Sequence, residues 1–139
     1  MTEFALGALE KAIKNALSGA GQWTAVYIHR ATATAVKPYV VFYSTGGGED
    51  NDLKAEDATF TLGIKCIASS RGQAMAGAAE ISSRLNDKGI QDGGTLNGGA
   101  DWVITTATKE RLIDIPEYFA EADPIYHIGN VYRFEMERT

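Results

Sequence analysis

The sequence predicts an α+β fold: one mostly antiparallel sheet with two helices packed on one face. Two segments repeat apolar residues at three- and four-residue steps, as amphipathic helices do. Five further segments are continuously apolar or alternate between apolar and polar residues, which is typical of strands. Their order is helix, three strands, helix, two strands, and residues 1–139 show no linker, internal repeat or second core. We therefore expect a single domain with the helices covering one side of the sheet.

Composition restricts the class of protein. A chain of 139 residues suits one domain. The formal net charge of −5 argues against a surface that binds nucleic acid through general phosphate attraction. The only cysteine, Cys66, leaves no intramolecular disulfide and indicates synthesis in a reducing cytoplasm. No leader-like segment and no apolar run of about 20 residues occurs, so we expect a soluble protein without a membrane partner.

The first helix is predicted over Thr2–Leu17. Thr2 can cap it, and Glu3 in the first turn suits the helix dipole. Glycines at 19 and 21 favour its end. Its apolar stripe is formed by Leu6, Leu9, Ile13 and Leu17.

Three strand segments follow. Ala25–His29 is a weak strand, and the unbroken apolar run Tyr39–Ser44 indicates a strand buried on both faces. Thr59–Ala68 alternates and is predicted to pair with Tyr39–Ser44 as a hairpin. Between them, Gly46–Asp57 combines glycines with charges and is predicted to be a loop or a mobile hairpin tip. One face of the alternating strand carries Phe60, Leu62, Ile64 and Cys66.

The second half of the chain begins with a helix predicted over Ser70–Asn86, which Ser69 or Ser70 can cap. Its apolar face is formed by Ala74, Ala78, Ile81 and Leu85.

A glycine-rich stretch, Asp92–Gly99, is predicted to be flexible. The last two strands are predicted over Trp102–Ile113 and Ile128–Glu137, with Phe134 and Met136 pointing to the core. The segment between them, Pro116–Tyr126, is predicted to be a loop.

No residue pattern indicates catalysis. The two histidines, His29 and His127, lack a neighbouring nucleophile and acid, and mid-strand Cys66 is interpreted as core. Gly46–Gly48 is followed by acids, which would repel a phosphate. A calcium loop counted from Asp50 fails at its fifth, sixth and twelfth positions. We predict a protein that is not an enzyme and has no cofactor and no metal site.

Two segments are candidates for an assembly interface or for the wall of a lumen. The first is acidic, and the second combines aromatic residues with acids, as protein interfaces often do. The alternative for the aromatic segment is that it folds back on the sheet. Trp23 and Trp102 are interpreted as packing residues. The candidate interface residues are Glu49, Asp50, Asp52, Lys54, Glu56, Asp57, Tyr118, Phe119 and Tyr126.

The chain resembles the tail-completion, or tail-terminator, proteins of long-tailed bacteriophages. The resemblance lies in the order and pattern of five segments along nearly the whole chain. These are the N-terminal helix Phe4–Leu17, the strand Pro38–Phe42, the alternating strand Thr59–Ile67, the helix start Arg71–Ala76 and the polar strand Asn130–Met136.

The resemblance implies a structural virion protein without catalytic activity or cofactor. Such proteins form hexameric rings that cap the tail tube, join it to the head-side neck or connector protein, and lie at the head-proximal end of the tail. Six copies of this chain would carry a formal charge of −30, since each carries −5. An acidic lumen would let DNA pass without binding it.

Two alternatives remain open at this point. The first is another neck or head-closure component of the same kind of virion, since such proteins have similar sizes. The second is a dimeric α+β domain that binds a small molecule, which would need convergent polar groups. The candidates for those groups are His29, His127 and Tyr132.

Overall fold

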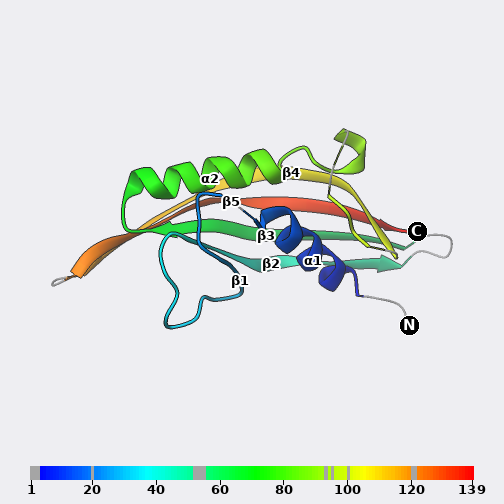
Figure 1. The fold of residues 1–139 in the computed structure, drawn as a ribbon. Helices are drawn as coiled ribbons and strands as arrows, with labels where there is room; N and C mark the ends of the chain where they lie inside the picture. The colour runs from blue at the N-terminus through cyan, green and yellow to red at the C-terminus, as the bar shows by residue number, and fades with distance from the viewer. Residues whose placement is uncertain are drawn as a thin grey trace.

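The structure is a computed structural model that describes residues 4–19, 21–51, 56–92, 94, 96–99, 101–119 and 122–139. One open five-stranded sheet carries two α-helices (Figure 1). The order of elements predicted from the sequence is confirmed. The elements are α1 (Ala5–Leu17), β1 (Val26–Ile28), β2 (Tyr39–Asn51), β3 (Glu56–Ala68), α2 (Arg71–Leu85), the short 3-10 helix η1 (Ile90–Asp92), β4 (Trp102–Phe119) and β5 (Ala122–Arg138).

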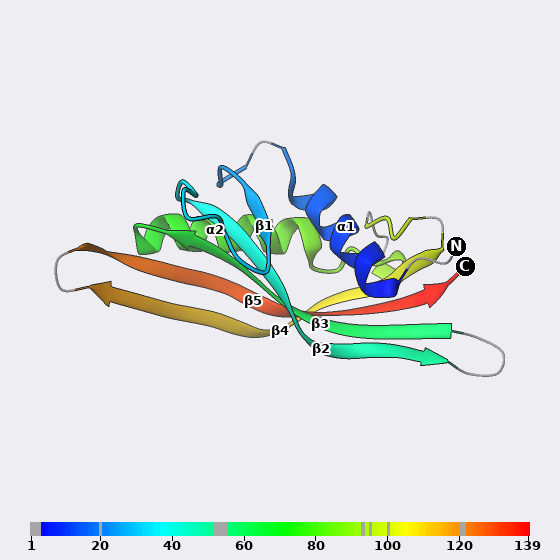
Figure 2. The same cartoon turned by 90° about the horizontal axis from the view of Figure 1, so that it is seen from below.

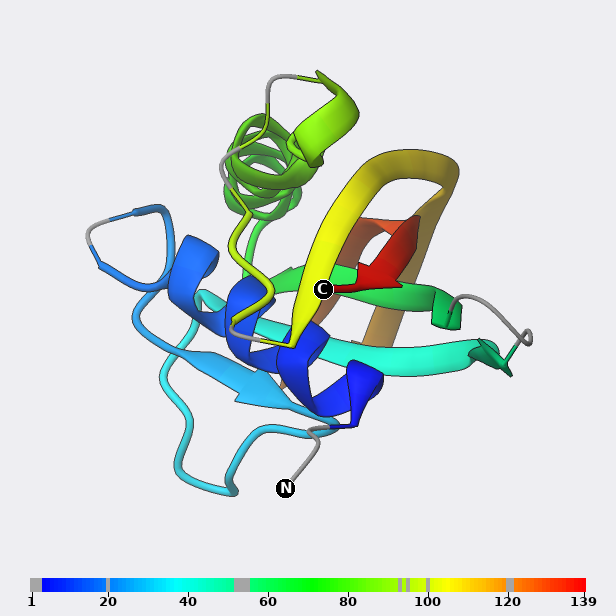
Figure 3. The ribbon, with the colours of Figure 1, turned by 90° about the vertical axis from the view of Figure 1, so that its right-hand side faces the viewer.

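The strands lie in the order β1-β2-β3-β5-β4. β1 runs parallel to β2, and every other neighbouring pair is antiparallel, so the prediction of a mostly antiparallel sheet is confirmed. The edge strands are therefore β1, with three residues, and β4, with 18. Figure 3, viewed along the sheet, shows both helices on one side of it.

The helices cover one face of the sheet because the apolar stripe of each helix packs against the apolar face of the alternating strands. α1 begins at Ala5, one residue after Phe4, and Thr2 lies outside the described residues. In α2, the Ser70 hydroxyl accepts a hydrogen bond from the backbone N–H of Gln73 at 3.2 Å, which confirms the predicted cap. The largest fully buried side chains are Trp102, Tyr132, Phe42, Phe134, Leu9, Ile13, Leu17, Leu62, Ile64, Ile81, Leu85 and Ile104.

The predicted packing roles of both tryptophans are confirmed. Trp23 is buried, and its indole N–H donates to the Leu17 carbonyl at 3.0 Å. The Arg84 guanidinium lies 5.0 Å from its ring centroid. Trp102 is buried at the start of β4, with the Arg138 guanidinium 4.4 Å from its ring centroid.

Of the two predictions for Gly46–Asp57, the hairpin is confirmed and the loop is wrong over most of its length. β2 continues to Asn51 and β3 begins at Glu56, so only residues 52–55 lie outside the described structure. Glycines and charges usually indicate a turn, but here the β2–β3 ladder continues through backbone hydrogen bonds, which any residue except proline can make. Gly47 shows why a glycine is present: its φ is +113°, and a Cβ there would lie 2.1 Å from the Thr59 carbonyl oxygen.

The predicted loop Pro116–Tyr126 is also wrong. Pro116 and Tyr118 belong to β4, and Tyr126 belongs to β5, which together form one long hairpin. A proline cannot donate to a sheet ladder and is tolerated on an edge strand. The position of β4 at the edge is therefore the physical reason that Pro116 does not end the strand.

Candidate assembly interface

The acidic and aromatic candidates lie at opposite ends of the sheet. Along β3, Asp57 pairs with Glu137 at one end and Ala68 pairs with Tyr126 at the other. At a rise of about 3.3 Å per residue, these ends are roughly 35 Å apart. Figure 2 shows the two hairpins, β2–β3 and β4–β5, projecting in opposite directions. One chain therefore presents two separate candidate contact regions.

At the acidic end, the pairing of β2 with β3 continues without a register shift. Glu49 pairs with Ala58, Asp50 pairs with Asp57, and Asn51 pairs with Glu56. Asp57 is exposed. Asp52 and Lys54 lie outside the described residues. The paired strands therefore carry Glu49, Asp50, Glu56 and Asp57 at this end of the sheet.

At the aromatic end, the three candidates differ. Tyr118 is 73% exposed and lies at a register shift between Glu117 and Phe119, which identifies a β-bulge. Phe119 is the last residue of β4. Tyr126 packs against a small apolar cluster formed by Ala68, Ala74, Ala78 and Ile128. Folding back on the sheet, the alternative left open by the sequence, is therefore correct for Tyr126 and wrong for Tyr118.

Sequence reasoning missed three exposed apolar side chains on edge strand β4, which do not share one face of the sheet because Leu112 and Ile115 are three residues apart in a regular part of the ladder. Leu112, Ile115 and Tyr118 are 66%, 50% and 73% exposed. The first half of the β4 edge is covered by the segment after α2: the N–H of Asp87 donates to the Ala107 carbonyl at 2.8 Å, and Asn86 Oδ1 accepts from the N–H of Lys109 at 3.0 Å. That these side chains lie on an edge strand could be found only from the strand order, because nothing local in the sequence indicates that β4 is an edge.

One ion pair joins α2 to the second half of β4. The Arg71 guanidinium donates to both Asp114 carboxylate oxygens, at 3.0 and 2.8 Å. These hydrogen bonds lower the pKa of Asp114 below its usual value. Because Arg71 is the first residue of α2, the ion pair holds the N-terminus of the helix beside edge strand β4.

The sheet face opposite the helices carries a group of titratable side chains. His127 Nε2 lies 2.5 Å from Glu117 Oε1. Burial and the positive charge of Lys65 lower the pKa of His127, while Glu117 opposes that shift. Burial also lowers the pKa of Lys65, whose ammonium lies 5.5 Å from the centroid of the Tyr43 ring.

The candidates for a small-molecule site do not converge. Tyr132 is fully buried on the helix-covered face, where it stacks on Phe134, and burial raises its pKa to about 12. His127 extends from the opposite face of the same strand, since the two positions differ by an odd number of residues. Cys66 is buried, and burial raises the pKa of its thiol to about 11, which confirms its predicted place in the core.

The described residues contain neither a metal-binding cluster nor a membrane-spanning helix. Within the described ranges, no three His, Cys, Asp or Glu side chains gather closely enough to hold a metal ion. Neither helix of the described structure combines the length and apolar character needed to cross a bilayer.

Comparison with known proteins shows structural similarity but no match to a family model. No protein-family model matches the chain, and no curated protein matches it. A chain from a solved structure described as the virion of a native gene transfer agent particle is similar, with a TM-score of 0.71 and 22% sequence identity. The similarity covers 98% of this chain and 99% of that chain. At this identity the comparison shows a shared fold over essentially the whole length of both chains.

Proposed function

We propose that this chain is a structural protein of a phage-like virion and that it acts as a tail terminator. In this role, copies form a ring that caps the tail tube and joins it to the head. The observation that carries the proposal is the shared fold with a chain of a gene transfer agent virion, over 98% of this chain and 99% of that one. The resemblance of the sequence pattern to tail-completion proteins supports the same role independently of that comparison.

The surfaces of the protein support assembly. Leu112, Ile115 and Tyr118 are exposed apolar side chains on an edge strand, and an exposed strand edge is a ready template for pairing with another chain. The two hairpins lie at opposite ends of the sheet (Figure 2). A protein that contacts identical neighbours through two different surfaces makes head-to-tail contacts, and these close into a ring when the rotation per copy allows it.

The ring that we propose is a hexamer with an acidic lumen. Six copies would carry a formal charge of −30, and DNA would pass through without specific binding. The tail tube protein is the proposed partner on one side, and a neck or connector protein is the partner on the other. The proposed role needs no catalytic residue, cofactor or membrane.

The mass of the purified protein, measured by light scattering over a concentration series with and without magnesium, tests the proposal. A hexamer, imaged as a ring by negative-stain microscopy, is the expected result. A monomer that joins a ring only after the tube protein is added also agrees with the proposal. A stable dimer that ignores the tube protein would contradict it.

A neck component is the alternative that this measurement does not separate from a terminator. Pull-down with immobilised tube protein and, separately, with immobilised portal-side adaptor protein distinguishes the two. A terminator is retained by the tube protein. Retention by the adaptor alone would assign the chain to the neck instead.

A further inference from the structure

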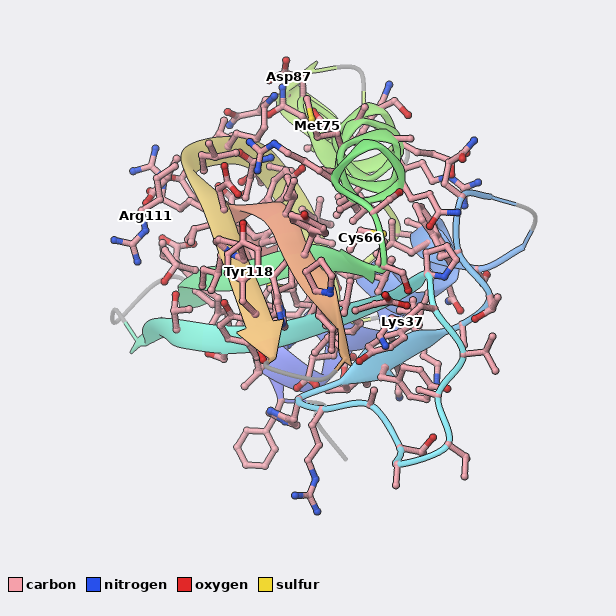
Figure 4. All side chains as sticks on the ribbon, turned by 90° about the vertical axis from the view of Figure 1, so that its left-hand side faces the viewer. Lys37, Cys66, Met75, Asp87, Arg111 and Tyr118 are labelled. Carbon is pink, nitrogen blue, oxygen red and sulfur yellow. The ribbon has the colours of Figure 1, made fainter. Side chains whose placement is uncertain are left out.

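A basic, aromatic groove lies on the sheet face that the helices leave uncovered. It runs between the connection 29–38 and the outer side chains of β2 and β3, and consists of two adjoining hollows of about 400 Å³ and 450 Å³. Figure 1 shows this connection on the side of the sheet opposite α2, and Figure 4 labels Lys37 within it. The groove residues that matter here are His29, Arg30, Tyr39, Tyr43, Lys65 and Ile67.

The groove presents the positive charges of Arg30 and Lys65. Among the described residues, no aspartate or glutamate lines either hollow. Arg30 and Lys65 have no carboxylate within ion-pair distance among the described residues. Glu117 contacts His127, and its charge also acts on Lys65 and Tyr39 at the side of the groove. Partly exposed tyrosines beside the cations add apolar contact area.

The same chain carries a complementary segment. Residues 49–57 contain five acids and one lysine, a formal charge of −4. This segment spans the far end of the β2–β3 hairpin, whereas the groove lies at the Tyr39 end of the same hairpin. Tyr43 of the groove and Glu49 of the acidic segment are six residues apart along β2, so the nearest ends of the two regions are separated by roughly 20 Å. A continuous ladder keeps them apart, and they cannot meet within one chain.

We propose that the groove of one copy receives the acidic β2–β3 hairpin end of a second copy. The occupant is chosen by charge complementarity between a cationic groove and the most acidic segment of the chain. Since the two surfaces differ and lie at opposite ends, the contact is head-to-tail, as a ring requires. The proposal rests on the proposed ring function and names the surfaces that join neighbouring copies.

Zero-length carbodiimide cross-linking of the purified full-length protein, with and without tube protein, tests the contact. The reagent joins a lysine amine only to a carboxylate in direct contact with it. We expect amide links from Lys37 or Lys65 to acids in 49–57 in the multimer bands of a denaturing gel. The monomer band should lack them, because the groups are too far apart within one chain.

A charge exchange provides the second test. Arg30→Glu should weaken self-association roughly tenfold, and Glu49→Lys with Asp50→Lys should do the same, since each places like charges together. Combining the two changes should restore association. Lys14→Glu makes the same change of charge on exposed α1, outside this groove, and should have little effect. Association should also weaken at 1 M salt, where the screening length falls to about 3 Å.

Four outcomes would overturn the proposal. Multimers whose cross-links map to other surfaces would refute this contact while leaving the ring function intact. Unchanged association in both charge variants would also refute this contact and leave the ring function intact. Loss of binding to a fluorescent DNA oligonucleotide in Arg30→Glu, with association unchanged, would make the groove a nucleic-acid site. If no multimer forms under any condition, including with tube protein, both the contact and the proposed function are wrong.

Discussion

Gly77 of α2 packs directly on the side chain of Cys66 in β3. A Cβ added at Gly77 would lie 2.3 Å from Cys66 Sγ and 2.7 Å from Cys66 Cβ, closer than real contacts allow. The glycine therefore lets the helix backbone approach the sheet to a distance that no other residue permits. Ala74 and Ala78, which are buried in the same helix, serve the same close packing.

Gly77→Ala should destabilise the protein by about 1–3 kcal/mol, because rotation of the Cys66 side chain cannot move its Cβ and the helix must shift. Gly72→Ala is the matched control. Gly72 is exposed in the same helix with nothing near its added Cβ, and its replacement should be neutral or stabilising by up to about 1 kcal/mol. Urea denaturation followed by circular dichroism measures both. Equal destabilisation would contradict the direct-contact explanation.

Ile64→Asp should unfold the chain, since Ile64 is fully buried on the helix-covered face and an unpaired charge there costs several kcal/mol (~3 or more). Phe60→Asp should behave similarly. Thr59→Asp places the same residue on the exposed face of the same strand and should keep the fold. Measurement of thermal unfolding distinguishes the two core variants, Ile64→Asp and Phe60→Asp, from the surface variant Thr59→Asp.

The acidic hairpin end should tolerate substitution. Glu49→Gln combined with Asp50→Asn should leave the melting temperature nearly unchanged, because isosteric amides preserve the strand backbone that pairs with β3. The same variant should weaken assembly. If this variant lost its fold as Ile64→Asp does, the distinction between core residues and assembly residues would be wrong.

The Cys66 thiol should resist alkylation in the native state at pH 8 and react after unfolding, because burial raises its pKa to about 11 and the reactive thiolate is scarce. The pKa of the Cys66 thiol in the folded state lies above the unfolded value of about 8.5. Its contribution to the free energy of unfolding is therefore fully present below pH 8.5. The contribution is lost as the pH rises towards 11. Labelling with iodoacetamide, followed by mass spectrometry, measures the protection, and rapid native labelling would contradict the buried position.

The imidazole of His127 should titrate below its ordinary range. Burial lowers the pKa of His127 in the folded state below the unfolded value of about 6.5. The contribution of this group to the free energy of unfolding is therefore fully present above pH 6.5, and it is lost as the pH falls from that value towards the folded pKa. Glu117→Gln should lower the pKa further, and Lys65→Met should raise it. NMR titration of the ring protons measures both, and Glu110→Gln, which removes a carboxylate that contacts Arg133, serves as the control.

Local periodicity predicted the helices and the paired core strands well. The alternation in 59–68 and the step pattern of Leu9, Ile13 and Leu17 correspond to residues that are buried in the structure. The predicted strand ends were wrong because Gly46–Asn51 and Pro116–Phe119 have compositions typical of turns. Pairing with a neighbouring strand outweighs that local preference, and such pairing is a long-range property that strand propensity describes poorly.

The sequence by itself determined which residues are apolar, how they repeat and therefore which elements form and which faces they bury. Tertiary structure alone decided that β4 is an edge strand, that Tyr126 is covered while Tyr118 is exposed, and that the acidic and aromatic ends point apart. The physical reason is that periodicity arises within one turn or one strand, where a few neighbouring residues set it. Strand order depends on pairings between distant segments, so the surfaces available for assembly become visible only in the folded chain.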